Sequence, residues 1–313
     1  MRRLVDRALD ASIVGGFSRL GPLVRSRLGG WERFPDGHLL GRSIAVTGPT
    51  SGLGRAAVAE FDRLGADLVL IGRDAGRLEE VRTALSGSDR TRIFVCDMGD
   101  LDAVARAAKG LADEVPRLDA LVHNAGALTS ARSQTVQGFE GTLATHVLGP
   151  QLMTRLLRDR LVGGRVVTVS SGGMYAARLP DVSDGRAPEV RPYDGTRQYA
   201  LAKRLQVTLN EIDAAADTGV FHAAMHPGWA DTPGVRSSLP GFARVTSPIL
   251  RTADEGADTI VWLVATGDVL PSGRFWCDRA ERPIHRLPAT RNSDRPDARL
   301  ALRAWVDAAI SRS

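Results

Sequence analysis

Residues 43–54 read SIAVTGPTSGLG, a short apolar run followed directly by a turn that contains three glycines. The run predicts a strand, and the apolar spacing of residues 53–64 predicts the helix after it. Glycines at such a turn let the backbone approach a phosphate, and the helix N-terminus offers free N–H groups with a partial positive charge. The stretch therefore predicts a dinucleotide-binding turn, although glycines there can also serve tight packing alone. The cofactor-binding candidates are Gly48, Thr50, Ser51, Gly52, Leu53 and Gly54.

The alternation of strand-like and helix-like segments continues along the chain. Further strands are predicted at 67–71, 91–96, 118–123, 165–170, 220–225 and 274–277, with helices at 76–85, 100–113, 138–159, 197–216 and 253–266 between them. Apolar strands separated by helices predict an α/β fold with a doubly wound parallel sheet (Rossmann fold) of about seven strands. We expect a dinucleotide-binding catalytic domain over 38–280, a basic amphipathic N-terminal arm over 1–37, and a C-terminal tail over 281–313 that ends in a helix.

Composition and charge exclude several classes of protein. The chain is 43% hydrophobic and 25% charged, enough apolar residues to bury a core, yet no apolar run reaches the roughly 20 residues that span a bilayer. Two cysteines, Cys96 and Cys277, exclude a disulfide scaffold and indicate a reducing cytoplasm. The absence of a basic stripe with interleaved aromatic residues argues against nucleic-acid binding.

The N-terminal arm is the most basic part of the chain. The net charge is +5, and residues 1–37 contribute seven arginines against four acids. Apolar residues recur there at helical spacing. The arm could lie on an anionic membrane surface, at the inner face of the membrane, or it could pack on its own domain. The recurring residues are Leu4, Val5, Leu9, Ile13, Phe17, Leu20, Val24 and Leu28.

The ends of the next three strands predict further cofactor contacts. The second strand ends at Arg73, where NAD-binding sheets place an acid for the ribose diol, and an arginine can instead hold a 2′-phosphate. NADP(H) is therefore favoured over NAD(H). The third strand ends at Asp97 and Met98, and the fourth at Asn124, Ala125 and Gly126. Asp97 could instead cap a helix, and Asn124 could be a turn residue or bridge neighbouring strand ends.

The predicted chemistry lies in Ser171, Tyr199 and Lys203. Tyr199 and Lys203 are four residues apart on a predicted helix, so they share one face, and the ammonium would lower the pKa of the phenol. A phenol tuned in this way can exchange a proton when a carbonyl and an alcohol interconvert. Ser171 follows the fifth strand and can hydrogen-bond the same substrate oxygen. With three tyrosines in the chain and only two lysines, Lys109 and Lys203, this spacing is specific.

These motifs together resemble the short-chain dehydrogenase/reductase family over residues 42 to about 278. The stretches VTVSSGGMY (167–175) and HPGWADTPGV (226–235) are similar to its family-member-12-like branch. The resemblance implies that Tyr199 is the acid/base, that Lys203 binds the nicotinamide ribose and tunes Tyr199, and that Ser171 orients the substrate oxygen. It also implies a substrate-covering loop over 233–250. The resemblance further implies that the nicotinamide end of the cofactor is lined by Pro227, Gly228, Trp229 and Thr232.

One position departs from the family pattern. Many members carry an asparagine in the helix after the fourth strand, and alignment on Gly149 puts His146 at its place. An imidazole can bind water and pass protons, or it can disturb the helix geometry, or it can be an inert buried histidine. His146 is therefore a candidate catalytic residue whose role stays open.

Two classes of function follow from these residues. The first is an NADP(H)-dependent oxidoreductase for a small, hydrophobic carbonyl or alcohol substrate, and the second is a non-catalytic dinucleotide-binding or redox-sensing protein. A homodimer through 138–159 and 197–216 is plausible, although the arm and tail could block it. No metal site is predicted, because His222 and His226 on an extended strand would have Cα atoms about 13 Å apart.

Overall fold

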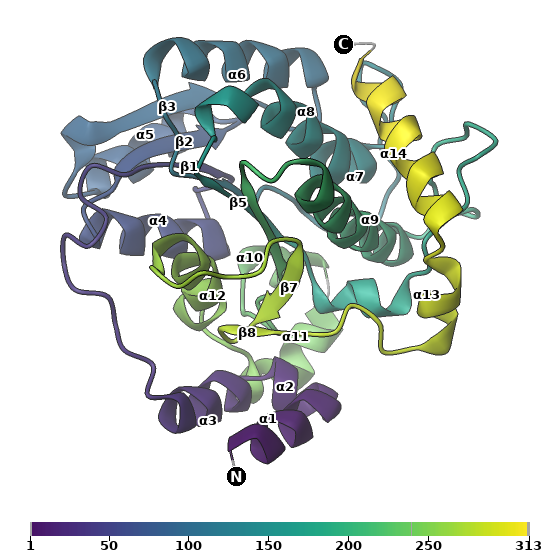
Figure 1. Ribbon diagram of the computed structural model, residues 1–313, viewed down its shortest axis with the longest axis horizontal. Coiled ribbons are helices and arrows are strands. Elements are labelled where there is room, and N and C mark those ends of the chain that lie inside the picture. Colours follow the sequence, from purple (N-terminus) through teal and green to yellow (C-terminus); the bar gives the residue numbers. More distant parts are fainter. Residues whose placement is uncertain (1, 239, 312–313) are drawn as a thin grey trace.

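The computed structural model describes residues 2–238 and 240–311, and its centre is one eight-stranded sheet in the order β3-β2-β1-β4-β5-β6-β7-β8 (Figure 1). Neighbouring strands are parallel except β7 and β8. The sheet confirms the predicted doubly wound α/β fold. The strands are β1 (Ser43–Thr47), β2 (Asp67–Gly72), β3 (Thr91–Val95), β4 (Ala120–His123), β5 (Arg165–Val169), β6 (Phe221–Met225), β7 (Arg274–Cys277) and β8 (Ala280–Glu281).

Helices cover both faces of the sheet because successive strand residues point to opposite sides. In β1, Ala45 belongs to the core cluster under one helical layer, whereas Ile44 and Val46 belong to the cluster under the other. The first layer contains α6 (Leu101–Glu114), α8 (Gly149–Leu156) and α9 (Gly195–Ala216); the second contains α4 (Gly52–Arg63), α5 (Ala75–Ala84) and α12 (Ala253–Ala265).

The predicted strand count of about seven was one too low. β8 follows β7 after a two-residue turn in which Asp278 and Arg279 both have positive φ, 54° and 53°. Hairpin turns of this type usually carry Asn or Gly, so the pair Asp278-Arg279 gave no turn signal in the sequence. The chain therefore reverses direction between β7 and β8 at a position where the sequence pattern did not predict a turn.

Two predicted segments have a different internal structure. The helix predicted over 138–159 consists of α7 (Gly141–Leu143), a π-helical turn, η2 (Ala144–Leu148), and α8, and His146 lies in the π turn. The predicted loop over 233–250 forms two short helices, α10 (Pro233–Ser238) and α11 (Pro240–Thr246). The single-turn 3₁₀ segments are η1 (Ser88–Arg90), η3 (Arg158–Arg160), η4 (Gly172–Ala176) and η5 (Ser247–Ile249).

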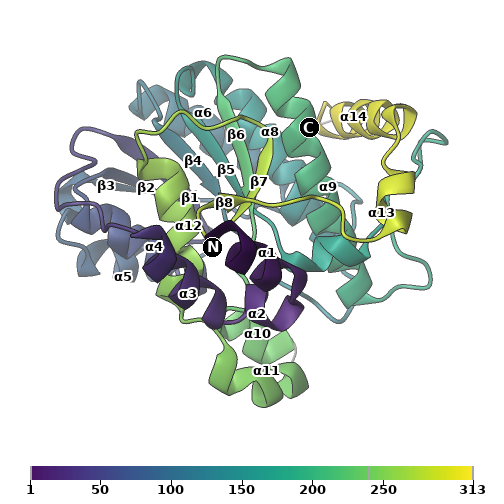
Figure 2. The ribbon, with the colours of Figure 1, turned by 60° about the horizontal axis from the view of Figure 1, so that its bottom comes forward.

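The N-terminal arm forms three helices that pack against the domain beside β8 and α11 (Figure 2). These are α1 (Arg2–Ala11), α2 (Ile13–Phe17) and α3 (Leu20–Gly29). At the other end of the chain, α13 (Pro288–Ser293) leads into α14 (Pro296–Ile310), which packs on α8 and α9. Within the described part of the chain, no helix combines the length and the apolar character needed to cross a bilayer.

Candidate active site

The glycine-rich turn leaves space at the N-terminus of α4. A Cβ built on Gly54 would lie 2.2 Å from the Gly48 carbonyl oxygen, and one on Gly48 would lie 2.9 Å from the Cα of Ala125. Gly48 and Gly52 also have positive φ, 67° and 51°. Ser51 is the N-cap residue of α4, but its side chain makes no capping hydrogen bond. The first N–H groups of α4 therefore suit an anion, and the turn fits a pyrophosphate.

A hydrogen-bond network joins this turn to the end of β4. The Thr47 hydroxyl accepts from the backbone N–H groups of Asn124 and Ala125, each at 3.0 Å. The Asn124 side-chain amide donates to the carbonyl oxygens of Thr47 and Gly48 at 3.1 and 3.0 Å. Asn124 thus bridges the two strand ends and shapes the turn from behind. Thr47 was not among the predicted site residues, although its position directly before Gly48 indicates that it belongs to the turn.

Arg73 and Asp97 follow the next strands of the sheet, and both are exposed. No ion pair or side-chain hydrogen bond joins Arg73 to any residue that the structure describes. Among the described residues, the Asp97 carboxylate accepts only from the Gly99 N–H, at 2.8 Å, and the N-cap of α6 is Asp100. Helix capping therefore does not explain Asp97, which is available to a ligand together with Arg73. The adjacent Met98 is buried.

Ser171, Tyr199 and Lys203 come together beyond the end of β5. The Ser171 hydroxyl accepts from the Gly173 N–H at 3.2 Å and lies close enough to Tyr199, which is partly exposed, to influence its pKa. The Lys203 ammonium is buried, donates to the Val169 carbonyl oxygen at 2.8 Å, and lies 5.3 Å from the centroid of the Tyr199 ring. α9 holds the tyrosine and the lysine one turn apart, as their spacing predicts.

Burial dominates the pKa values of these groups in the ligand-free chain. It raises the pKa of Tyr199, and the nearby Ser171 hydroxyl opposes that rise. Burial also lowers the pKa of Lys203 to about 7. The net shift of the Tyr199 pKa is thus upward, because burial is its largest cause, although the charge of Lys203 was expected to lower it.

His146 contacts Tyr199 and lines a cavity. Its ring meets Tyr199 edge to face at 5.4 Å between centroids, and its Nε2 lies 3.2 Å from the Ala127 backbone nitrogen. Burial keeps the pKa of His146 well below its usual value, so the ring is neutral. The His146 ring also fills the space beside Gly126, where a Cβ would lie 2.2 Å from it.

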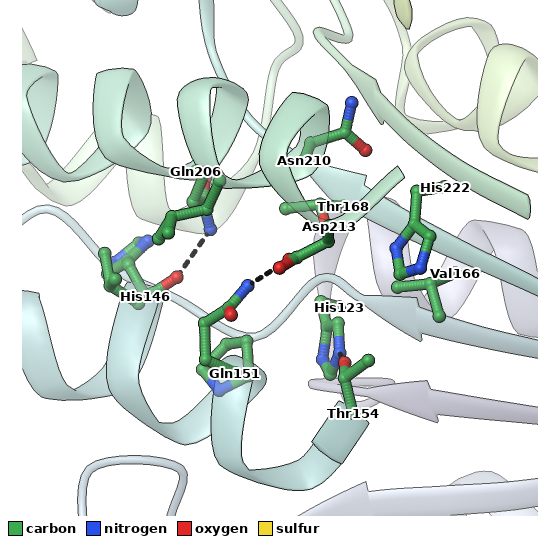
Figure 3. A pocket seen from close by; sticks show the side chains of 13 residues that line it. His123, His146, Gln151, Thr154, Val166, Thr168, Gln206, Asn210, Asp213 and His222 are labelled. Atoms are coloured by element: carbon green, nitrogen blue, oxygen red, sulfur yellow. Dashed lines mark hydrogen bonds between the residues drawn. The ribbon is translucent and has the colours of Figure 1, made fainter. Parts of the chain in front are cut away.

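The cavity behind His146 is polar and small, about 20 Å³, enough for one water molecule. His146, Gln206, Gln151 and Asp213 line it, with His123 and His222 on the sheet side (Figure 3). Gln206 donates to the His146 carbonyl oxygen at 2.8 Å, and Gln151 donates to Asp213 at 2.7 Å. Gln206 was not among the predicted site residues, since nothing in the sequence around it distinguishes it from other helix residues.

The segment after β6 links the glycine turn to the N-terminal arm. Thr232 lies against Gly52, whose built Cβ would be 3.2 Å from the threonine side chain. Gly228 has a φ of 74°, and the Trp229 N–H donates to the Phe17 carbonyl oxygen at 2.7 Å. A Cβ on Gly228 would meet the Arg251 side chain at 2.3 Å. Pro227, Gly228, Trp229 and Thr232 therefore form one wall of the site, which the arm supports from behind.

Phe17 reaches from the arm to Gly172, the residue after Ser171. Its ring occupies the space beside Gly172, where a Cβ would lie 2.4 Å away, and it packs edge-on to Trp229 at 6.0 Å between centroids. Arg251 is 1% exposed and donates to the Phe17 and Gly16 carbonyl oxygens at 3.0 and 2.7 Å. These two residues gave no signal in sequence analysis, because their contact joins positions far apart in the chain.

Metal ligation has no support in these side chains. No group of three or more His, Cys, Asp or Glu residues within 2–238 and 240–311 is arranged to hold an ion. His222 lines the polar cavity, whereas His226 packs against the rings of Phe17 and Phe275. The two cysteines are free and buried.

A glycine turn on a parallel sheet, with a serine, tyrosine and lysine grouped at the strand ends, defines an NAD(P)-dependent oxidoreductase. A family model described as short chain dehydrogenase matches residues 42–178. The chain belongs to the short-chain dehydrogenase/reductase family.

Individual relatives refine this assignment. The chain is 37% identical over 264 residues to "Dehydrogenase/reductase SDR family member 12" of Bos taurus, covering 82% of each chain, which confirms the resemblance to that branch. It is 34% identical over 281 residues to "Putative daunorubicin C-13 ketoreductase DnrU" of Streptomyces sp. (strain C5), covering 88% of this chain and 94% of the relative. A crystal structure titled as a "putative NAD(P) dependent gluconate 5-dehydrogenase" from Beutenbergia cavernae, with bound NADP at low occupancy, is 25% identical with a TM-score of 0.59, covering 73% of this chain and 91% of that one.

Proposed function

We propose that this protein is an NADP(H)-dependent oxidoreductase that interconverts a carbonyl and an alcohol on a small hydrophobic substrate, with Tyr199 as the acid/base. The observation that carries the proposal is the grouping of Ser171, Tyr199 and Lys203 beside a glycine turn whose free N–H groups suit a pyrophosphate. When bound, the nicotinamide supplies or accepts the hydride.

The residues of the site then handle the proton and the substrate oxygen. In the reducing direction the Tyr199 hydroxyl donates its proton to the carbonyl oxygen, and in the oxidising direction it takes the proton from the alcohol. The Ser171 hydroxyl, close to Tyr199, donates a second hydrogen bond to that oxygen and orients it. Turning Lys203 from the Val169 carbonyl toward a cofactor ribose would bring its charge closer to the phenol oxygen and lower the Tyr199 pKa.

For His146 we propose a relay role next to Tyr199. The ring contacts Tyr199, and its Nδ1 has no hydrogen-bond partner among the described residues although it is buried. A water in the adjacent cavity can bond to this nitrogen and exchange protons. His146→Gln keeps a polar group but removes the ring nitrogens, so we expect kcat to fall about tenfold with an unchanged affinity for NADPH. An unchanged kcat would contradict the relay role and leave His146 with a role in packing only.

The preference for NADP(H) rests on Arg73. Its side chain is exposed at the end of β2, where it can pair with a 2′-phosphate, and the Beutenbergia cavernae relative binds NADP. Asp97 and Met98 would contact the adenine, and Asn124, Ala125 and Gly126 the adjoining ribose, because they follow β3 and β4 at the same edge of the sheet.

Support for a hydrophobic substrate comes from aromatic side chains that pack near Ser171. Trp229, Phe17 and Tyr175 form an aromatic cluster beside Ser171, with Phe17 and Tyr175 stacked at 6.3 Å between centroids. The Streptomyces relative, whose name describes reduction of a ketone on daunorubicin, favours the same class of substrate. We propose a ketone or aldehyde flanked by apolar or aromatic groups.

NADPH and NADH binding, measured by fluorescence, tests the cofactor assignment on the wild type, Arg73→Ala and Arg77→Ala. Arg77 is the matched control, an exposed arginine four residues further along. We expect Arg73→Ala to weaken NADPH binding by about tenfold, with little change for NADH and none for Arg77→Ala. Equal losses for both cofactors would remove Arg73 from the phosphate site, and failure of the wild type to bind either would overturn the proposed function.

A panel of apolar ketones and aldehydes tests the chemistry. Tyr199→Phe should retain NADPH binding and lose at least about a hundredfold in kcat, because it removes the donated proton and little else. A variant that kept full activity would exclude Tyr199 as the acid/base.

For location and assembly we propose a cytoplasmic enzyme whose arm touches a membrane surface. The free, buried Cys96 and Cys277 support a reducing compartment. The homodimer expected through α8 and α9 meets an obstacle, because α14 covers both helices in the same chain. We therefore propose that any dimer uses another face.

A further inference from the structure

The three helices of the N-terminal arm all carry exposed aliphatic side chains. In α3, Leu20, Leu23 and Leu28 are exposed, whereas the side facing the domain carries Gly21, Pro22 and the buried Arg25. A surface helix of a water-soluble protein has the opposite arrangement, with its apolar stripe toward the core. The apolar spacing of this helix therefore serves something outside the domain.

In α1 and α2, Leu4, Ile13 and Val14 are exposed as well, whereas Phe17 is buried and Val5 and Leu9 are half-buried. The exposed aliphatic side chains of the arm form a set that spans all three helices, and the exposed Arg7, Arg19 and Arg27 accompany them. Arg19 lies 3.8 Å from Glu255, and no bonded partner is recorded for the other two in the described ranges. The exposed fractions are Leu4 70%, Ile13 57%, Val14 51%, Leu20 46%, Leu23 43% and Leu28 39%. We call this set, with its three arginines, the outer face of the arm.

The carboxylates of the arm point the other way. Residues 2–29 contain two acids, Asp6 and Asp10, and both are bonded to arginines of the arm or domain. Asp6 accepts from Arg25 at 2.7 Å and from Arg282 at 3.0 Å, and Asp10 accepts from Arg286 at 2.7 Å. The outer face thus combines aliphatic side chains with positive charge and holds no carboxylate of the arm.

We propose that the outer face of the arm docks on an anionic lipid bilayer. Aliphatic side chains entering the headgroup boundary, together with arginines that pair with lipid phosphates, are the two contributions that hold an interfacial helix. A second copy of this chain fits worse, because a symmetric pairing of this face would place arginines against arginines with no carboxylate of the arm between them.

The docked arm would hold the substrate site close to the lipid. Phe17, on the inner side of α2, fills the space beside Gly172, and its carbonyl oxygen binds the Trp229 N–H. The arm is therefore packed directly against the back of the wall of the site. This consequence rests on the proposed function, whereas the docking itself needs no catalysis.

Vesicle flotation of the full chain tests the docking. We expect the wild type to float with vesicles of three parts phosphatidylcholine to one part phosphatidylglycerol, and much less with phosphatidylcholine alone or at high salt. Ile13→Asp with Leu23→Asp should reduce the bound fraction about tenfold. Val269→Asp and Leu300→Asp are matched controls, since these side chains are 100% and 73% exposed outside the arm, and they should float like the wild type.

Three outcomes would overturn the proposal: no flotation of the wild type with anionic vesicles, equal loss in the control variants, or equal binding to neutral and anionic vesicles. Self-association by light scattering that Ile13→Asp with Leu23→Asp abolishes would assign the face to a second copy. NADPH binding by the same variants shows that they are folded. Because flotation does not involve the nicotinamide site, a failure here is distinct from a failure of the proposed enzyme.

Discussion

At the scale of single residues, Gly54 is the clearest requirement for cofactor binding. A side chain there would place its Cβ 2.2 Å from the Gly48 carbonyl oxygen and 2.4 Å from the Asn124 amide nitrogen. Gly54→Ala must push the helix away from the turn and break the Asn124 bridge between β1 and β4. We predict that Gly54→Ala loses at least about tenfold in NADPH affinity, measured by fluorescence titration.

Gly76→Ala is the control for this substitution. Gly76 lies in α5, and a Cβ there would meet only the Asp74 carboxylate at 3.5 Å. Alanine favours a helix over glycine by roughly 0.5–1 kcal/mol, so this variant should bind NADPH normally and unfold at a slightly higher temperature. Normal NADPH affinity in Gly54→Ala would contradict the predicted pyrophosphate site.

Lys203 should make the stability of the fold depend on pH. Burial lowers its pKa from 10.5 to about 7, so between these values the unfolded chain binds more protons than the folded one. Stability then rises with pH in that window, by up to about 1.4 kcal/mol per pH unit from this group. The substitution Lys203→Met removes this pH-dependent contribution to the free energy of unfolding. We predict that the variant exceeds the wild type in free energy of unfolding by the largest amount near pH 7, and that this difference becomes smaller toward pH 9.

Chemical denaturation of both proteins at several pH values measures the difference. The comparison is needed because the buried Cys96 and Cys277, whose pKa values burial raises to about 12, add an opposite slope above pH 9 in both proteins. If the difference in free energy of unfolding between the two proteins stays constant from pH 7 to pH 9, Lys203 stays charged in the folded chain.

At the scale of elements, the pattern of residues predicted most helices and strands to within a few positions. β1, for example, was predicted at 43–47 and lies there, because a buried strand between a polar start and a glycine turn has a strong signal. The docking of the arm was different. Helical spacing predicted its helices, but the partners of Asp6 and Asp10 are Arg282 and Arg286, about 276 residues away, and such pairs leave no periodic signal.

The site was predicted where its residues form local motifs and was missed where contacts are distant. The pair Tyr199 and Lys203 lies on one helix, so its spacing alone was informative. Phe17 and Arg251, by contrast, meet only in the folded chain. The direction of the Tyr199 pKa also required the structure, because it depends on burial and on where the Lys203 ammonium points.

The attachment of the arm depends on Asp278. This carboxylate, with a side chain 2% exposed, pairs with Arg251 at 2.6 Å and with Arg25, which are 1% and 6% exposed. Asp278→Asn leaves the buried Arg251 without its carboxylate and Arg25 with Asp6 alone, and breaking a buried pair in this way typically costs about 3–5 kcal/mol. We predict that this variant unfolds at a lower urea concentration and that trypsin cleaves its arm faster.

Asp307→Asn provides the matched control, since Asp307 pairs with Arg303 at 2.8 Å on the surface and is 51% exposed. Loss of such a pair should change stability by less than about 1 kcal/mol. Equal unfolding midpoints for Asp278→Asn and the wild type would show that the buried pairs do not hold the arm.

At the scale of the whole molecule, α14 takes the place on α8 and α9 that a partner subunit would need (Figure 1). Leu302 and Val306 are fully buried in the core cluster that these helices share. Around them, Arg299 pairs with Glu211 at 2.6 Å and Arg303 with Asp213 at 3.0 Å. The tail therefore covers apolar surface within one chain.

This arrangement predicts that the wild type does not pair through α8 and α9. Removing residues 295–313 would uncover the apolar residues that Leu302 and Val306 contact, so the shortened chain should self-associate, whereas Leu302→Ala should destabilise the fold by about 2–5 kcal/mol without pairing. Light scattering over a range of concentrations measures the first effect and urea unfolding the second. Leu300→Ala, at an exposed position of the same helix, should change neither. A wild-type dimer that cross-links through α8 and α9 would contradict this assignment, because it would require α14 to leave the surface on which it packs.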